Sequence, residues 1–273
     1  MIPWAQIVGW RNSAPWISHA QVEQDLIMSR ALVTIFQEPF LAGQLAFRGG
    51  TALHKLHFSP PRRYSEDIDL VQIEPGAIGP IIDRIQEILG EFLGKPRRNQ
   101  AEGTVTLIYR MESEGSPAIS MRLKVEINTR EHFSVEGFRK IPFSVDSRWF
   151  QGSCEITTYT LEELLGTKTR ALYQRRKGRD LIDLWLGLTE GKARAERVVE
   201  IFRRYMDFEG NTVDGRTYEK NLREKMKHPG FASDIESLLP GGASYDLQRA
   251  FDCVHREIVS RLDKEELPEK KRV

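Results

Sequence analysis

The sequence predicts an α+β protein in two parts, a mixed sheet with flanking helices in residues 1–150 and a mostly helical region in residues 151–273. Two observations support this division. Short segments in which apolar and polar residues alternate, the pattern of half-buried strands, occur before residue 150. Segments with helical periodicity dominate after it, and strands grouped ahead of helices are typical of an α+β fold.

Composition narrows the function classes. Hydrophobic residues make up 40% and charged residues 29% of the chain, as in ordinary globular proteins. There is no apolar run near the roughly 20 residues of a membrane helix and no signal-peptide pattern, so we expect a cytoplasmic protein with no membrane partner. Cys154 and Cys253 are far apart, which argues against a disulfide framework or a zinc site. Because the formal net charge is only +1, binding to a phosphate backbone would depend on local basic patches.

Helices and strands are mixed in the predicted first part. One helix begins after Ser18, a suitable N-cap, and an amphipathic helix ends near Gly94. The last two strands should be antiparallel neighbours. In chain order we expect a helix, a strand–turn–helix segment, a strand, a helix and two strands: residues 18–37, 44–58, 66–73, 80–94, 103–112 and 119–131.

Helices make up the predicted second part. Thr160 and Glu163 form a capping box that starts the first of them. Further helices are expected over residues 179–188 and 192–206, followed by two or more to the end. The terminal stretch, Asp263–Val273, should be frayed.

A Gly–Gly turn in FRGGTALHKL is the first candidate for chemistry. Gly49 and Gly50 permit positive φ and close backbone approach, and the following helix offers free N–H groups and a dipole that suit a phosphate. Thr51 could add a hydroxyl, and Lys55, one turn on, could reach the same anion. A plain tight turn explains the glycines equally well, because the segment is not a Walker loop.

Two aspartates separated by one residue follow in RRYSEDIDLV. On a strand, Asp67 and Asp69 point to the same face while Ile68 enters the core. Carboxylates about 4 Å apart repel by about 4 kcal/mol at an effective dielectric near 20, and a divalent cation relieves that repulsion. Mg²⁺, with Mn²⁺ as the alternative, takes one or two carboxylates plus substrate phosphates. An exposed strand face with solvated acids is the alternative interpretation.

A third carboxylate is available on the later strand MRLKVEIN. Lys124 and Glu126 share one face of that strand and could join Asp67 and Asp69. Three carboxylates on adjacent strands would hold two Mg²⁺ ions about 4 Å apart, which clamp the attacking and leaving oxygens of an in-line displacement. A half-solvated strand is the alternative.

Lys168 is the most informative residue of the helical part. It lies within the apolar stripe of its helix, and a buried ammonium is costly unless it is paired with an acid or a phosphate. Asp180 and Asp183 share a face of the next helix and could pair with it as a purely structural contact. A basic run leads into that face and supplies candidate RNA-binding residues: Arg175, Arg176, Lys177 and Arg179.

These blocks together resemble a known family. A Gly–Gly–Thr turn, an Asp–Ile–Asp strand and a strand bearing a carboxylate form the pattern of the nucleotidyltransferase fold of the DNA polymerase β type. More narrowly, FRGGTALHKLH…RYSEDIDL, then LKVEI and LLGTKTRAL…RRKGRDLIDL, look like the AbiEii/MenT nucleotidyltransferase toxin family. The resemblance runs from about Val22 to Leu188.

The resemblance implies a toxin of a toxin–antitoxin or phage-defence pair. Such a protein transfers a nucleotide from an NTP to RNA, in several members to the 3′ end of tRNA, which blocks aminoacylation and translation. The implied partners are the NTP, tRNA or another RNA acceptor, and a cognate antitoxin protein. By position, the triphosphate contacts would be Gly49, Gly50, Thr51, Ser65 and Lys168, and the Mg²⁺ ligands would be Asp67 and Asp69. Asp180 of the helical part would complete the site, either by orienting Lys168 or by contacting the nucleotide.

Other readings of the same residues stay open. The family's second block is variable, so the operative residue could be Lys124 or Glu126. The acceptor could be a small molecule or a protein hydroxyl instead of RNA. A non-catalytic nucleotide-binding toxin that acts through a partner is a further alternative.

Overall fold

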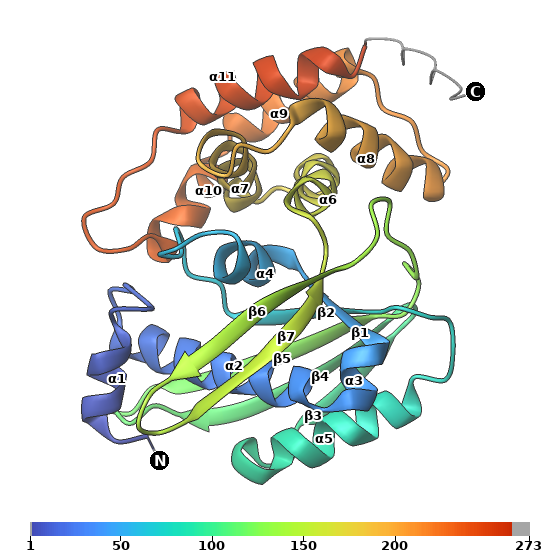
Figure 1. Ribbon diagram of the computed structural model, residues 1–273. Helices are drawn as coiled ribbons and strands as arrows, with labels where there is room; N and C mark the ends of the chain where they lie inside the picture. The colour runs from blue at the N-terminus through green and yellow to red at the C-terminus, as the bar shows by residue number, and fades with distance from the viewer. Residues whose placement is uncertain (1, 264–273) are drawn as a thin grey trace. The chain divides into compact units, whose positions relative to one another are not determined.

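The computed structural model describes residues 2–263 and confirms the predicted α+β class (Figure 1). The chain divides into two compact units. One runs to Leu164 and also takes in Leu238–Ser244, and the other comprises Leu165–Ser237 and resumes at Tyr245. The first unit therefore continues past residue 150 and contains the whole sheet. None of the helices between residues 2 and 263 is long and apolar enough to cross a membrane.

The first unit is built on a seven-stranded mixed sheet in the order β3-β4-β5-β2-β1-β7-β6. Its strands are β1 Leu45–Arg48, β2 Asp67–Gln72, β3 Arg97–Ala101, β4 Thr104–Glu112, β5 Ser120–Asn128, β6 Arg139–Asp146 and β7 Gln151–Thr158. Its helices are α1 Trp4–Trp10, α2 His19–Gln37, α3 Pro39–Gln44, α4 Gly49–Leu56 and α5 Gly79–Leu93, and α6 Leu161–Gln174 begins in it.

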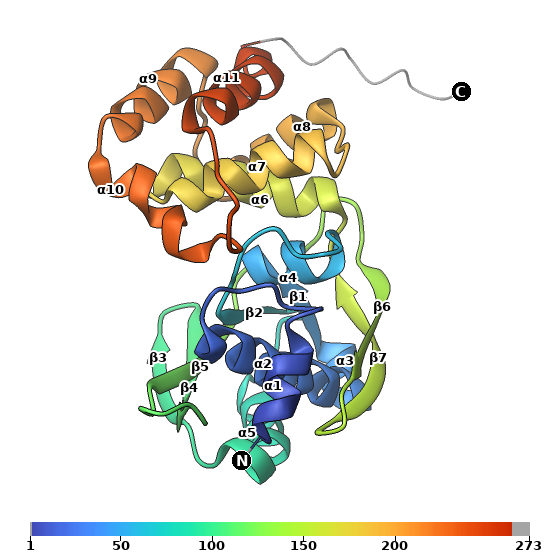
Figure 2. The same ribbon diagram turned by 90° about the vertical axis from the view of Figure 1, so that its left-hand side faces the viewer.

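Strand β2, which carries Asp67 and Asp69, lies in the middle of the sheet, so its two neighbouring strands determine which side chains lie beside these aspartates. It pairs antiparallel with β1 and parallel with β5. Strands β4 and β5 are antiparallel neighbours, as the alternation predicts. Helix α4 packs on β1 and β2, and α2 packs on β5, β6 and β7 (Figure 2).

Three strands of the structure, β3, β6 and β7, are not predicted from the sequence. Strand β3, RRNQA, is exposed at every position, so it lacks the alternation of a half-buried strand. Strands β6 and β7 form an antiparallel hairpin at the other edge of the sheet. Because β7 spans Gln151–Thr158, the predicted second part opens with a strand, and its first helix follows at Leu161, where the capping-box spacing placed it.

The predicted helix boundaries agree with the local chemistry. Helix α2 begins after Ser18, which forms a capping box with Gln21. Helix α5 ends where Gly94 takes a positive φ of 73°. At α6, the Thr160 hydroxyl accepts from the Glu163 N–H at 3.2 Å, one of the two bonds of a capping box. The Glu163 carboxylate accepts from the Val135 N–H at 2.7 Å and so fixes the segment before β6.

The second unit is helical. The remainder of α6 is followed by α7 Gly178–Thr189, α8 Ala195–Phe208, α9 Gly215–Met226, α10 Pro229–Ala232, the 3₁₀ segment Ser233–Leu238, α11 Leu247–Glu257 and a second 3₁₀ segment, Val259–Arg261. Its core includes Phe202 and Tyr218, whose rings meet edge to face. Apart from Asp263, the terminal stretch predicted to fray lies outside the described residues.

Candidate functional site

The Gly–Gly turn joins β1 to α4 and brings backbone against the carboxylate strand. Gly49 has a φ of 81°, and a Cβ there would lie 2.2 Å from the Asp69 Oδ2. A Cβ on Gly50 would lie 2.4 Å from an Nη of Arg63. Glycine is therefore required twice, once for backbone conformation and once for space. The first turn of α4 begins at this point, and its N–H groups have no partners within the helix.

Thr51 and Ser65 lie behind this turn. The Thr51 hydroxyl is 2.5 Å from the Asp67 carbonyl oxygen and 2.8 Å from the Ser65 hydroxyl, and the Thr51 side chain is buried. These bonds tie α4 to the first residue of β2. The two hydroxyls thus lie beside the carboxylate strand, as predicted, and are bonded to each other.

Asp67 and Asp69 lie on the same face of β2, and Ile68 and Leu70 are buried on the opposite face. The parallel register places Asp67 opposite Lys124 and Asp69 opposite Glu126. This register brings both predicted β5 residues to the aspartate pair.

Lys124 is the central cation of the cluster. Its Nζ lies 3.4 Å from the Asp67 Oδ2 and 3.1 Å from the Glu126 Oε2. Burial alone would lower the pKa of Lys124, but the charges of Asp67 and Glu126 raise it above its ordinary value. Both β5 candidates are therefore in contact with the cluster, Glu126 through the lysine.

Both aspartates prefer the protonated form more than an ordinary carboxyl does. Burial is the main cause of the raised pKa of Asp69, and the charges of Asp67 and Glu126 raise it further. Burial also raises the pKa of Asp67, while Lys124 opposes that shift. The protein thus keeps two carboxylates together at a cost in folding free energy.

Arg48 is a site residue that the sequence does not reveal. It is the last residue of β1 and stands directly opposite Asp69 across the antiparallel pair. Its guanidinium forms an ion pair with Glu131, which follows β5. Arg48 opposes the raised pKa of Asp69 and so stabilises the ionised form. In the sequence, only its position immediately before the two glycines could have indicated that Arg48 belongs to the site.

The donor set fits a divalent cation at Asp67 and Asp69. Two carboxylates with raised pKa values gain from a cation, and Mg²⁺ needs only one or two protein carboxylates when substrate phosphates complete its coordination. Among residues 2–263, no group of three or more His, Cys, Asp or Glu side chains is gathered closely enough to hold a metal. Glu126 is bonded to Lys124, so its part as a third ligand stays a prediction.

A second cluster lies within the helical unit around Lys168. The Lys168 Nζ is 3.1 Å from the Asp180 Oδ1 and 2.9 Å from the Asp183 Oδ2, and all three side chains are buried. Arg175 clamps Asp180 with two hydrogen bonds, of 2.7 and 2.9 Å. Burial opposes ionisation of Asp180, but Lys168 and Arg175 together hold its pKa below the ordinary value.

Lys168 pairs with Asp180 and Asp183, which is the purely structural contact that the sequence allowed as an alternative to phosphate binding. Asp180 contacts and orients Lys168, one of the two parts that the resemblance allowed it. These contacts stabilise the helical unit whether or not the lysine also meets a phosphate. The role of Lys168 in nucleotide binding therefore rests on the family pattern.

Most of the predicted RNA-binding residues form ion pairs with acidic side chains. Arg175 pairs with Asp180, and Asp234 lies 3.4 Å from the Lys177 Nζ and 3.5 Å from the Arg179 Nε. Arg176 is exposed and has no ion-pair partner within the described part of the chain.

Lys55 is paired with a buried acid, so its predicted contact with an anion stays a prediction. Its Nζ lies 2.9 Å from both the Asp25 Oδ1 and the Ser29 hydroxyl. Asp25 also accepts from the indole N–H groups of Trp10 at 2.9 Å and Trp16 at 3.2 Å. The lysine therefore belongs to a buried network that joins α4 to α1 and α2. Sequence separation hid this network, because Asp25 and Lys55 are 30 positions apart.

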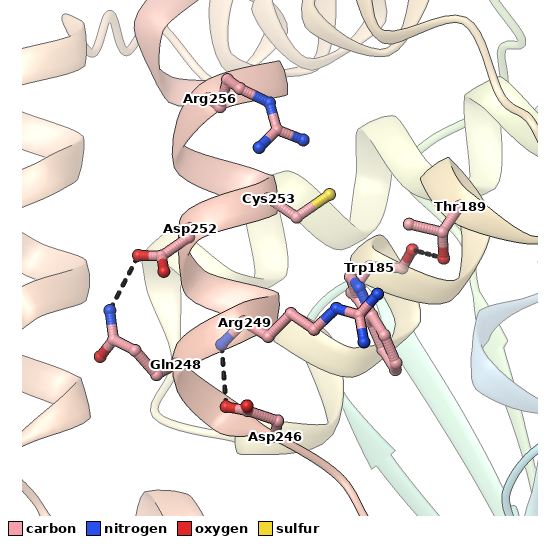
Figure 3. A pocket seen from close by; sticks show the side chains of 8 residues that line it. All are labelled: Trp185, Thr189, Asp246, Gln248, Arg249, Asp252, Cys253 and Arg256. Atoms are coloured by element: carbon pink, nitrogen blue, oxygen red, sulfur yellow. Dashed lines mark hydrogen bonds between the residues drawn. The ribbon is translucent and has the colours of Figure 1, made fainter.

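A separate cavity of about 540 Å³ lies in the helical unit between α7 and α11. Figure 3 shows Arg249, Cys253 and Arg256 on the side of α11 that faces Trp185 and Thr189 of α7. None of the predicted site residues lines it. Its acidic and basic side chains alternate, and no single ligand charge is favoured.

Known proteins of similar structure share the fold. JHP933 from Helicobacter pylori matches with a TM-score of 0.53 and 16% identity, covering 90% of this chain and 94% of that chain. A putative nucleotidyltransferase from H. pylori matches with a TM-score of 0.51 and 17% identity, covering 91% and 100%. Comparison with curated protein sequences gives no significant match. At these identities the structural likeness establishes the nucleotidyltransferase fold.

The family is established by sequence. A family model described as "Nucleotidyl transferase AbiEii toxin, Type IV TA system" matches residues 30–253. That range contains the Gly–Gly turn, the aspartate pair and the Lys168 cluster, and it covers more than half of the chain. The protein therefore belongs to the AbiEii nucleotidyltransferase toxin family of type IV toxin–antitoxin systems.

Proposed function

We propose that this toxin transfers a nucleotide from an NTP to an RNA hydroxyl, the 3′ end of tRNA, and thereby blocks aminoacylation and translation. The observation that supports this most directly is the Asp67–Asp69 pair held in register beside the Gly49–Gly50 turn. A cytoplasmic site of action and a cognate antitoxin protein follow from a type IV toxin–antitoxin role.

The residues of the first unit divide the work by position. The first turn of α4, at Gly49 and Gly50, would receive the triphosphate, because its free N–H groups and helix dipole suit an anion. Asp67 and Asp69 would hold Mg²⁺, which when bound would offset the charge on the triphosphate and on the leaving pyrophosphate. Arg48, opposite Asp69, favours the ionised form of that carboxylate and so opposes part of the cost of burial.

The reaction would be an in-line displacement at the α-phosphorus. The RNA 3′-hydroxyl oxygen forms the new P–O bond, the bond between the α-phosphorus and its bridging oxygen breaks, and pyrophosphate leaves. The hydroxyl proton passes to a neighbouring carboxylate, Asp69 or Glu126. The chain contributes mostly positioning and electrostatic stabilisation, the usual protein share in phosphoryl transfer.

The family pattern gives Lys168 a further part as a ligand of the NTP phosphates. Its contacts with Asp180 and Asp183 hold the ammonium in one position, which suits a group that must meet an anion. Lys168→Met removes that charge but also leaves two buried acids short of a partner. Its activity must therefore be read beside its thermal stability, and a proper test compares it with Asp183→Asn, which loosens the cluster and keeps the lysine.

A direct assay tests the proposed function. Purified protein is incubated with total tRNA, Mg²⁺ and each labelled NTP in turn, and label on RNA is measured. We expect transfer with at least one NTP, loss of transfer in Asp67→Ala, and loss on chelation of divalent cations. Absence of label on RNA with every NTP, or transfer unchanged in Asp67→Ala, would contradict the proposal. Label on a small molecule or on protein would identify the other acceptor classes.

A further inference from the structure

Two arginines face each other on the sheet beside the aspartate pair. Arg110 of β4 is directly opposite Arg122 of β5, and both side chains are exposed. Residues directly opposite on antiparallel strands have Cβ atoms about 5 Å apart, and like charges in that position destabilise the pair. Within residues 2–263 neither side chain has an acid or hydrogen-bond partner that would offset this repulsion.

The register shows where this arginine pair lies. Lys124, the next residue on the same face of β5, is opposite Asp67, and Arg97 of β3 is opposite Ile108 of β4, which is itself opposite Lys124. Strand geometry then places Arg122 about 8 Å from Asp67, and Arg97 about 14 Å from it. We call Arg97, Arg110 and Arg122 the arginine row. It crosses three strands on the face that carries the aspartates.

The arginine row and the Gly–Gly turn lie on opposite sides of β2. The sheet order puts β1, which leads into Gly49, on one side of β2, and β5, β4 and β3 on the other. In an in-line displacement the attacking and leaving oxygens approach the metal site from opposite directions. If the turn receives the triphosphate, the arginine row is on the side from which the acceptor arrives.

A pocket of about 480 Å³ adjoins the arginine row. Arg110 and Arg122 line it together with Tyr64 and Glu66, the residue immediately before the aspartate pair. Gln24 also lines it, and its side-chain amide donates to the Arg122 carbonyl at 2.9 Å. The pocket therefore connects the two arginines to the start of the carboxylate strand.

We propose that the arginine row binds the phosphate backbone of the acceptor RNA, with the 3′-terminal nucleotide in the adjoining pocket and its hydroxyl directed to the aspartate pair. The proposal rests on the proposed function and names where its acceptor lies. An anion between Arg110 and Arg122 removes their repulsion, just as a cation does for Asp67 and Asp69.

The position and length of the arginine row favour RNA over other phosphates. The triphosphate already has a proposed site at the Gly49–Gly50 turn, on the other side of β2. A small acceptor would use one contact near Asp67, whereas the row extends about three strands, or 14 Å, away from it. An extended nucleic-acid strand with a negative charge at each residue matches the length of the arginine row.

The test uses the double substitution Arg110→Gln/Arg122→Gln in the full chain. Labelled tRNA is titrated in the absence of NTP and Mg²⁺ at several salt concentrations, and KM values for RNA and for NTP are measured separately. Loss of two single-strand phosphate contacts should reduce the slope of log K against log salt by about 1.4. We expect a KM for RNA raised about tenfold and a KM for NTP unchanged.

The matched control is Arg139→Gln/Arg148→Gln. It removes the same charge from two exposed arginines of the same unit, at β6 and the turn after it, the opposite edge of the sheet. RNA binding unchanged in the first variant, an equal loss in both variants, or a rise confined to the KM for NTP would each overturn the proposal. The failure of the proposed function gives a different result. In that case the unsubstituted protein transfers no nucleotide to RNA, and the RNA titration, which needs no NTP, still tests the arginine row.

Discussion

Asp69 is the residue at which folding stability and the proposed chemistry oppose each other. It lies against the backbone of Gly49, opposite Arg48, and beside two other carboxylates. Burial and those like charges make its ionised form unfavourable in the metal-free protein. A buried carboxylate that costs stability beside a glycine turn is typical of a functional site.

We therefore predict that Asp69→Asn stabilises the metal-free protein while it abolishes nucleotide transfer. At pH 7 the ionised carboxylate is disfavoured in the fold, and the neutral amide should add about 1 kcal/mol to the free energy of unfolding. A raised pKa in the folded state costs stability only at pH values at which the carboxyl group of the unfolded chain is ionised. The gain in the variant should therefore vanish near pH 4. Thermal melts at the two pH values measure it, and a destabilised variant at pH 7 would contradict it.

Gly49→Ala should damage the site through geometry alone. The new Cβ would lie 2.2 Å from the Asp69 Oδ2, at a φ of 81° that alanine rarely adopts. We expect a loss of about 1–3 kcal/mol in stability and at least about tenfold in transfer rate. Gly90→Ala is the control, because its Cβ would meet nothing within 4 Å and it lies inside α5. That variant should gain up to about 1 kcal/mol.

At the scale of elements, one buried carboxylate connects three helices of the first unit, α1, α2 and α4. Asp25 of α2 accepts from Trp10, from Trp16 and from Lys55 of α4. The lysine thereby fixes α4, whose first turn carries the two glycines. Residues away from the proposed substrate contacts thus fix the direction of the Gly49–Gly50 turn.

A double-mutant cycle on Asp25→Asn and Lys55→Met tests this anchoring. Each single variant leaves a buried charge short of its partner and should cost about 3 kcal/mol, with a coupling energy of about 1–3 kcal/mol. Chemical denaturation gives the free energies. The exposed pair Glu224–Lys227, at 2.8 Å, is the control and should couple by less than about 0.5 kcal/mol. Additive losses at Asp25 and Lys55 would disprove the anchoring.

At the scale of the whole molecule, a near-neutral chain carries strongly charged local sites. With a formal net charge of +1, there is no global field to attract RNA, so attraction depends on clusters such as the arginine row. Buried charges also link folding to pH. Lys225 is the clearest case, because its Nζ donates to the Leu172 and Tyr173 carbonyls and burial lowers its pKa to about 8.

Stability should therefore rise between about pH 7 and pH 9. Lys225 loses its proton near pH 8 when folded but keeps it to near 10.5 when unfolded, so the unfolded state binds more protons in this window. The rise should be about 1 kcal/mol after allowance for partial exposure. Denaturation at the two pH values measures it, and Lys225→Met should flatten the profile. A rise that persists in Lys225→Met would assign it to another group.

Local patterns in the sequence were sufficient for part of this picture. Alternation over two residues places Asp67 and Asp69 on one face, and the cap at Ser18 and the glycine after α5 mark helix ends, because each depends only on near neighbours. Glu163 shows the limit of this reasoning. The capping-box spacing is correct, yet the carboxylate binds a distant segment that offers better-placed donors.

The α+β class, the family and the paired carboxylates beside a glycine turn could all be predicted from the sequence, since they follow from short-range spacing and ordered motifs. The residues that meet those carboxylates could not, because Arg48 and Lys124 reach them through strand register. Helix packing likewise brings Lys55 to Asp25, in a separate network behind the glycine turn. The tertiary structure also set Arg110 opposite Arg122, a pairing that depends on the alignment of two strands. Register is fixed by burial of the whole sheet, and no short segment of sequence contains it.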